Sequence, residues 1–162
     1  MHSYSPAGAT IVSMQVHGFS DVSEEDYAGV VYLHMVDMTG NVHTSLVLSK
    51  SKVSPIKQLS IPRLELCGAQ VLIKLLCRAK EVFQLPMDCI YASTIVLHWL
   101  NGSPRRFKTY VGNRISYIID QVPPDRWSHV PGVENPADCA PRGLFPVQLK
   151  EYDLWWNGPQ WL

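Results

Sequence analysis

The sequence predicts one three-layer α/β domain, in which helices flank a mixed five-stranded sheet of three antiparallel strands followed by two parallel strands. Three observations lead to this prediction. The first third of the chain consists of short β-rich runs, and the remainder alternates amphipathic helical patterns with short strand-like runs. At 162 residues, the chain is also long enough to bury one sizeable core without disulfide bonds.

Three strands are expected in the N-terminal part of the chain. The β-rich runs are MQVHGFS at 14–20, YAGVVYLHMV at 27–36 and NVHTSLVLSK at 41–50. The segment DMTGN separates the last two runs and is typical of a turn, so these runs are expected to form a β-hairpin. An antiparallel arrangement of all three strands is the simplest interpretation.

The most regular pattern in the chain is helical and covers residues 63–83. Leu64, Cys67 and Val71 recur at helical spacing. Pro62 stands where helices often begin, because the first turn does not need its missing N–H group. We therefore expect a long amphipathic helix after the three strands.

Shorter elements complete the predicted fold. LPMDCIYA predicts a strand, and STIVLHWLNG predicts a helix that is capped by Ser93 or Thr94 and ends near Gly102. FKTYVGNRISYIIDQV predicts a second amphipathic helix, which ends at Pro123 and Pro124. RWSHVPG then predicts a strand, and ENPADCAPRGL predicts a short helix or helical turn.

The composition narrows the class of protein. Fourteen basic and fourteen acidic residues give zero net charge, which argues against a free-standing, highly basic nucleic-acid binder and suggests a piece of a larger protein. The four cysteines form no CxxC pair, so reduced thiols are expected. Because the sequence has neither a membrane-spanning apolar run nor a signal-peptide pattern, we expect a cytoplasmic protein with no membrane partner.

Three carboxylates are candidates for a site. Asp21 follows the first strand, Glu65 lies in the first turn of the long helix, and Asp138 comes late in the chain. Strand ends open onto the substrate cleft of α/β proteins, and buried carboxylates can share a hard divalent cation. The alternative is that Asp21 is a turn residue, Glu65 interacts with the helix dipole, and Asp138 is solvated. Spacing alone leaves both interpretations open.

Five ordered segments carry a resemblance to a known family. They are HGFSDVSEEDYAGVVYLH, SIPRLELCGA, STIVLHWL, WSHVPGVENPADCAPRGL and LWWNGPQWL. From about Val16 to Leu162 the chain resembles the ribonuclease H domain of BEL/Pao long-terminal-repeat retrotransposon polyproteins, also named the Pao retrotransposon peptidase family. The resemblance implies an RNase H-like fold and hydrolysis of RNA in RNA–DNA hybrids with Mg²⁺ or Mn²⁺. It also implies that Asp21, Glu65 and Asp138 are catalytic metal ligands.

The sequence departs from the family pattern at the third carboxylate. Family members typically have Trp-Thr-Asp directly before the Ser-Thr-Ile-Val-Leu run, whereas here Ala92 precedes Ser93 directly. The simplest alignment is a three-residue deletion, which removes about 10 Å of strand. We therefore expect a shortened strand or a helix without part of its first turn, and impaired hydrolysis because bridging carboxylates hold the metal ions.

Further residues are candidates through their position. His129 resembles the histidine or nearby polar residue that precedes the last Asp in related domains, a position that implies help with proton transfer or product release; a strand histidine packed near Trp127 is an equal alternative. The cluster Arg105, Arg106, Lys108 and Arg114 is a candidate nucleic-acid-binding surface, with a solvated helix face as the alternative.

The expected domain organisation is an N-terminal extension at 1–14, an RNase H-like domain at 15–145 and a C-terminal aromatic clasp at 146–162. The expected partners are an RNA–DNA hybrid and the reverse transcriptase and integrase segments of the same polyprotein. One alternative function is an inactive domain that binds nucleic acid or another polyprotein segment. An aspartic peptidase is disfavoured, because the segment DMTG has the wrong spacing for the catalytic loop.

Overall fold

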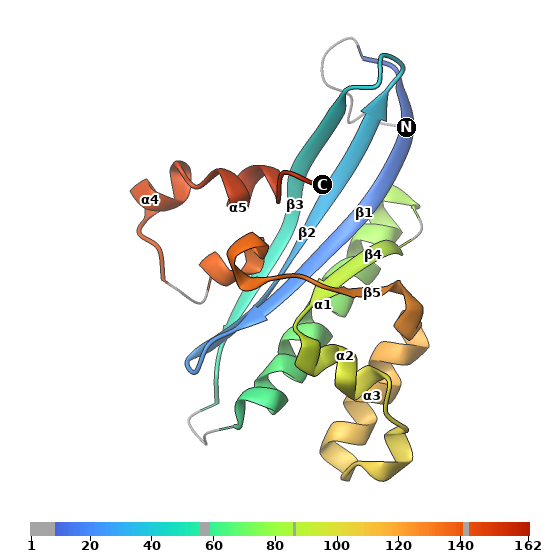
Figure 1. Ribbon diagram of the computed structural model, residues 1–162, viewed down its shortest axis with the longest axis vertical. Coiled ribbons are helices and arrows are strands. Elements are labelled where there is room, and N and C mark those ends of the chain that lie inside the picture. The colour runs from blue at the N-terminus through green and yellow to red at the C-terminus, as the bar shows by residue number, and fades with distance from the viewer. Residues whose placement is uncertain (1–8, 56–58, 86, 141–142) are drawn as a thin grey trace.

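Five strands form one mixed sheet in the order β3-β2-β1-β4-β5 (Figure 1). The computed structural model describes residues 9–55, 59–85, 87–140 and 143–162, so residues 1–8 of the expected N-terminal extension lie outside it. β1 (Ile11–Val22), β2 (Asp26–Asp37) and β3 (Val42–Val53) are antiparallel. β4 (Met87–Ala92) runs parallel to β1, and β5 (Trp127–His129) runs parallel to β4. The predicted fold class is therefore confirmed.

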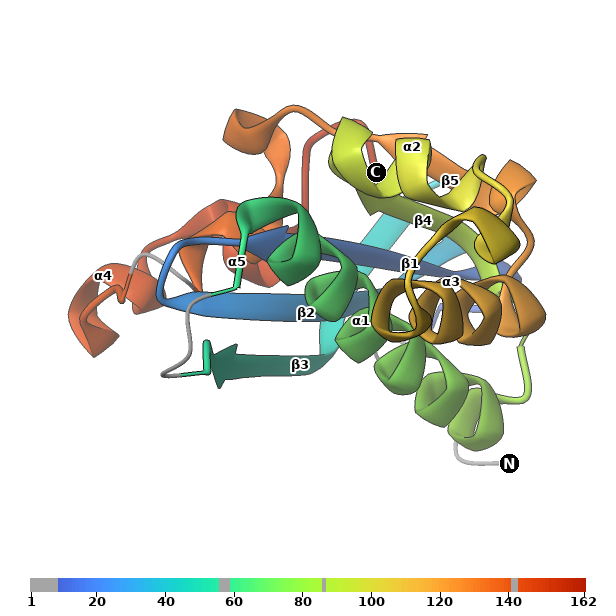
Figure 2. The same cartoon turned by 90° about the horizontal axis from the view of Figure 1, so that it is seen from below.

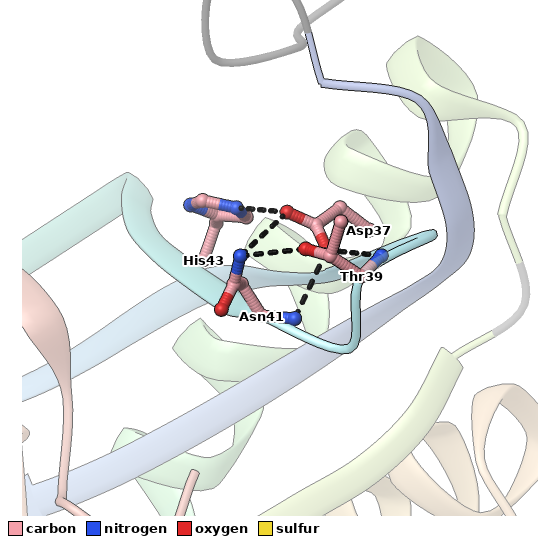
Figure 3. A network of polar contacts seen from close by, with 4 residues as sticks. All are labelled: Asp37, Thr39, Asn41 and His43. Carbon is pink, nitrogen blue, oxygen red and sulfur yellow. Dashed lines mark hydrogen bonds and ion pairs between the residues drawn. The ribbon is translucent and has the colours of Figure 1, made fainter.

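The turn between β2 and β3 is held by one carboxylate. The Asp37 side chain accepts hydrogen bonds from the Thr39 amide at 2.9 Å, the Thr39 hydroxyl at 2.6 Å and the Asn41 amide at 2.9 Å (Figure 3). His43 Nε2 lies 3.1 Å from its other oxygen. Gly40 takes a positive φ of 83°, which glycine adopts without a Cβ penalty. The segment DMTG thus forms a polar hairpin turn.

Helix α1 (Ile61–Phe83) covers one face of the sheet and packs closely against its strands. A Cβ atom at Gly18 would lie 2.9 Å from Leu72 Cδ1, and one at Gly29 would lie 3.0 Å from Leu72 Cα. At Gly29 the near atoms belong to the helix backbone, so glycine allows the close approach there, whereas at Gly18 the ends of the Leu72 and Leu76 side chains would have to shift. The main apolar core forms between the sheet and this helix, and it includes Leu66, Ile73 and Leu76.

Two further helices complete this side of the fold. α2 (Thr94–Leu100) follows β4, and α3 (Thr109–Gln121) lies beside α1 (Figure 2). The 3₁₀ turn η1 (Pro104–Arg106) joins α2 to α3, and η2 (Pro124–Arg126) leads from α3 into β5. Apolar side chains of α2 and α3 extend the core under α1.

The C-terminal part of the chain packs on the other face of the sheet. It contains two 3₁₀ turns, η3 (Gly132–Glu134) and η4 (Pro136–Cys139), and the short helices α4 (Pro146–Lys150) and α5 (Asp153–Asn157). Trp155 is buried here with Phe19 and Tyr32. The Tyr32 hydroxyl donates to the Trp155 carbonyl at 2.7 Å, so a buried hydrogen bond joins this segment to β2.

The described residues contain no helix whose length and apolarity would let it span a lipid bilayer. All four cysteines are free thiols.

Candidate active site

Asp21 lies at the C-terminal end of β1. Asp21 is the second-last residue of the strand and pairs with Ala28 of β2. The chain then reverses at Ser23, whose hydroxyl accepts hydrogen bonds from the Glu25 and Asp26 amides. This tight turn fixes the strand end, and with it the backbone position of Asp21.

Glu65 approaches Asp21 from α1. Its side chain is buried, and its Oε2 atom has no hydrogen-bond partner among the described residues. The helix comes close to β1 because residue 68 is glycine: a Cβ there would lie 3.2 Å from Val22 Cγ1 and 3.5 Å from the Asp21 carbonyl oxygen. Gly68 lies one helical turn from Glu65, so this contact sets the distance between Glu65 and the strand end.

Asp138 reaches Asp21 from the opposite face, through η4. Asn135 caps this turn: its Oδ1 accepts from the Ala137 amide at 3.1 Å. The same buried side chain donates from Nδ2 to the Ser20 carbonyl at 2.9 Å. Asn135 therefore attaches η4 to β1 beside Asp21, and the Asp138 carboxyl group hydrogen-bonds the Asp21 side chain.

The three carboxylates predicted from the sequence thus come from three elements and converge on one place. Burial, followed by the charges of Asp138 and Glu65, raises the pKa of Asp21 to about 7. Burial also raises the pKa of Glu65, and a hydrogen bond from Ser93 opposes part of that rise. Like charges held this close favour a shared proton or a bound cation.

The oxygen atoms of the three carboxylates are of the type that binds a hard divalent cation. Carboxylate oxygens are the ligands that Mg²⁺ and Mn²⁺ prefer, and the unpartnered Oε2 of Glu65 is available to such an ion. In the part of the chain that the structure describes, no three His, Cys, Asp or Glu side chains already form a cluster that could hold a metal ion. The residues therefore fit the ion by chemistry, while their present arrangement is not a preformed metal centre.

The end of β4 carries no carboxylate. Ala92 is its last residue and is fully buried. The carbonyl oxygen of Ala92 accepts from the Val130 amide at 3.3 Å and lies 3.4 Å from His129 Nδ1. Ser93 is the N-cap of α2 and accepts from the Val96 amide at 3.4 Å, as one of the two predicted caps. The first turn of α2 is therefore intact, and β4 ends directly before its cap.

Comparisons with known proteins identify the family. The family model described as the Pao retrotransposon-like RNaseH-like domain matches residues 7–94, which is more than half of the chain. The chain belongs to this family. The Pao match includes Asp21, Glu65 and the junction between β4 and α2, and it ends before His129 and Asp138. No curated protein matches the chain.

Solved structures similar to this Pao-family domain include RNase H1 from the halophilic archaeon Halobacterium salinarum NRC-1. That protein is 15% identical, with 78% of this chain and 92% of that chain covered and a TM-score of 0.42. Another is the Aquifex aeolicus member of the Ppx/GppA family, which is 11% identical, with 75% and 37% covered and a TM-score of 0.35.

The other predicted site residues of the Pao-family domain are one histidine on β5 and four basic residues on η1 and α3. His129 is exposed at the end of β5, opposite Ala92. Arg105 and Arg106 are exposed on η1, and Lys108 is the exposed N-cap of α3. Arg114 is half-buried on α3. These four basic residues follow one another from η1 onto α3.

The C-terminal tryptophans make different contacts. Trp155 is buried, whereas Trp156 and Trp161 are about half exposed. Trp161 Nε1 donates to Glu134 Oε2 at 2.7 Å, and its ring lies 5.0 Å from that of Tyr91. This contact joins the end of the chain to η3 and β4.

Sequence reasoning missed Asn135 and Gly68 as residues that position the carboxylates. The sequence could have indicated Asn135, because Asn followed by Pro is a common start of a helical turn. The sequence could not have indicated Gly68, because a glycine within a helical pattern does not reveal which strand the helix contacts.

Proposed function

We propose that this Pao-family domain binds RNA–DNA hybrids and retains an impaired form of the ribonuclease H reaction. The observation that carries the proposal is the convergence of Asp21, Glu65 and Asp138 beside a strand end occupied by Ala92. The three converging carboxylates support cation-assisted phosphodiester hydrolysis. The strand end at Ala92 lacks the carboxylate that the family typically supplies at this position.

The roles of the chain's own residues follow from their contacts. Asp21, Glu65 and Asp138 would hold Mg²⁺ or Mn²⁺, which when bound supplies Lewis acidity for attack of water on a phosphodiester. Ser93 orients the Glu65 carboxylate through its hydrogen bond, and Asn135 holds η4 so that Asp138 stays beside Asp21. With no carboxylate at Ala92, a second cation lacks a ligand, and we expect hydrolysis to be slow.

The proposed substrate contact lies on η1 and α3. Arg105, Arg106, Lys108 and Arg114 would bind backbone phosphates, which position a duplex without reading its sequence. His129 is proposed to assist proton transfer or product release. The zero net charge of the chain favours weak binding by this domain alone, so neighbouring reverse transcriptase and integrase segments of a cytoplasmic polyprotein would add to the affinity.

The second candidate is an inactive domain that binds nucleic acid or another polyprotein segment without hydrolysis. The observation in its favour is that β4 ends at Ala92, a fully buried residue without a carboxylate. The two candidates share the binding surface and differ only in residual hydrolysis.

Both candidates can be tested with one labelled hybrid. The wild-type chain is expected to bind it and to cleave its RNA strand slowly in Mg²⁺. Asp21→Asn should abolish the residual cleavage and preserve binding. Asp120→Asn, which changes an exposed carboxylate on α3, should alter neither. Cleavage that survives Asp21→Asn would overturn the assigned site, and a wild-type chain that binds no hybrid would overturn the proposed function.

A further inference from the structure

Two arginines face one tyrosine ring where α1 meets α3. The guanidinium carbon of Arg114 lies 3.7 Å from the ring centroid of Tyr110, and that of Arg63 lies 5.7 Å from the same centroid. Arg63 comes from the first turn of α1, whereas Tyr110 and Arg114 are one turn apart on α3. Both distances fall within the range of cation–π contacts, for which arginine is the favoured cation.

The tyrosine ring is fixed from the protein side and open on the solvent side. Its hydroxyl lies 3.4 Å from the Cys67 sulfur on α1, and Arg114 Nη1 donates to the Tyr110 carbonyl at 3.2 Å. Tyr110 is nevertheless 37% exposed, and Arg63 is exposed. The ring therefore acts as a rigid support that holds two guanidinium groups near the surface.

The positive charge of this cluster is not balanced. The ion pairs within the described ranges are His43 with Asp37 and Arg78 with Glu81, so neither Arg63 nor Arg114 is paired with a carboxylate there. Arg114 Nε is buried and has no hydrogen-bond partner among the described residues. An unpartnered buried N–H is costly, and a guanidinium fork matches the oxygens of a phosphate group.

The cluster also lies beside the proposed substrate path. Arg63 precedes Glu65 by two residues on α1, and Lys108, the N-cap residue of α3, precedes Tyr110 by two residues. Arg105 and Arg106 continue the positive charge along η1. The arginine pair thus belongs to the same two helices that carry Glu65 and the end of the basic cluster.

We propose that Arg63 and Arg114, supported by Tyr110, form a phosphate-binding site that takes one backbone phosphodiester of the nucleic acid. The proposal rests on the proposed function and adds to it a residue, Arg63, outside the predicted basic cluster. A purely structural role, in which the arginines only join α1 to α3, predicts no dependence of binding on either guanidinium.

The test compares hybrid affinity and its salt dependence among matched variants. Arg63→Gln should weaken binding about fivefold and reduce the slope of log affinity against log salt by about one, the value for one lost phosphate contact. Arg78→Gln removes another exposed arginine from the same helix, which is paired with Glu81, and should leave both quantities unchanged. Arg114→Lys keeps the charge and loses the planar fork, so binding should also weaken.

The overturning result is wild-type affinity and slope in both Arg63→Gln and Arg114→Lys. If the wild-type chain binds no hybrid, the proposed function fails, and inorganic phosphate then tests the site alone. Titration with phosphate should shift the NMR signal of Arg114 Nε–H in the wild-type chain and shift it less in Arg63→Gln. A signal that does not move at millimolar phosphate would overturn the site itself.

Discussion

Replacing Asp21 with asparagine should stabilise the metal-free domain at alkaline pH. Burial, followed by the neighbouring Asp138 and Glu65 carboxylates, raises the pKa of Asp21 from its ordinary value of 3.8 to about 7. Between these two values the folded protein keeps a proton that the unfolded chain releases. The free energy of unfolding of the wild-type chain should therefore fall as pH rises through this window.

The size of the effect follows from the shift. One pKa unit corresponds to about 1.4 kcal/mol, so the full rise sets an upper limit of about 4 kcal/mol. Because the carboxyl group is only partly buried, solvent screening reduces this value, and we expect Asp21→Asn to stabilise by about 1 to 2 kcal/mol at pH 8.5. At pH 4, which is close to the unfolded-state pKa of 3.8, little of this penalty has developed, so the two proteins should be nearly equal in stability.

Urea unfolding in the presence of a chelator measures this difference at pH 4, 6, 7 and 8.5. Asp120→Asn serves as the control, because this carboxylate is exposed on α3 and should change stability by less than about 0.5 kcal/mol. Added Mg²⁺ should stabilise the wild-type chain and have little effect on Asp21→Asn. The reasoning is refuted if Asp21→Asn is less stable than the wild-type chain at pH 8.5, or if both show the same pH dependence.

Two further predictions concern the elements that frame the site and the sheet. Asn135→Ala should lower the free energy of unfolding in urea by about 1 to 3 kcal/mol, because the variant leaves the buried Ser20 carbonyl without the Asn135 donor. Asn113→Ala, at an exposed position on α3, is the control. Equal effects of the two substitutions would contradict the role of Asn135. Hydrogen bonds from Thr39 and His43 hold the pKa of Asp37 well below its usual range. Asp37→Ala should therefore lower the melting temperature at pH 7, with a difference that shrinks as pH falls below about 4; a constant difference would argue against this linkage.

The local patterns predicted the fold class because each element is consistent with its surroundings. The turn signal DMTGN, the spacing within α1 and the Ser93 cap all have the structure expected of them. Element ends were less accurate. β1 begins at Ile11, three residues before the expected start, because pairing with the end of β2 extends the strand. β5 has only three residues, since it pairs only with Ile90 to Ala92 of β4.

The candidate site was harder to predict than the fold. The approach of Glu65 to Asp21 depends on Gly68, and the position of Asp138 depends on the hydrogen bond from Asn135 to β1. Both contacts join residues distant in the sequence, and neither leaves a periodic pattern. The cluster of Arg63, Tyr110 and Arg114 was only partly anticipated, because its members come from two helices whose facing sides the sequence does not specify.

The most direct measurement is single-turnover cleavage of the RNA strand of a hybrid in Mg²⁺. The unaltered chain is compared with a variant in which Trp-Thr-Asp is inserted after Ala92, and circular dichroism and hybrid affinity confirm that both are folded and bind. With a carboxylate restored beside Asp21, Glu65 and Asp138, the rate should rise at least about tenfold. Equal or faster cleavage by the unaltered chain would contradict an impaired ribonuclease H site.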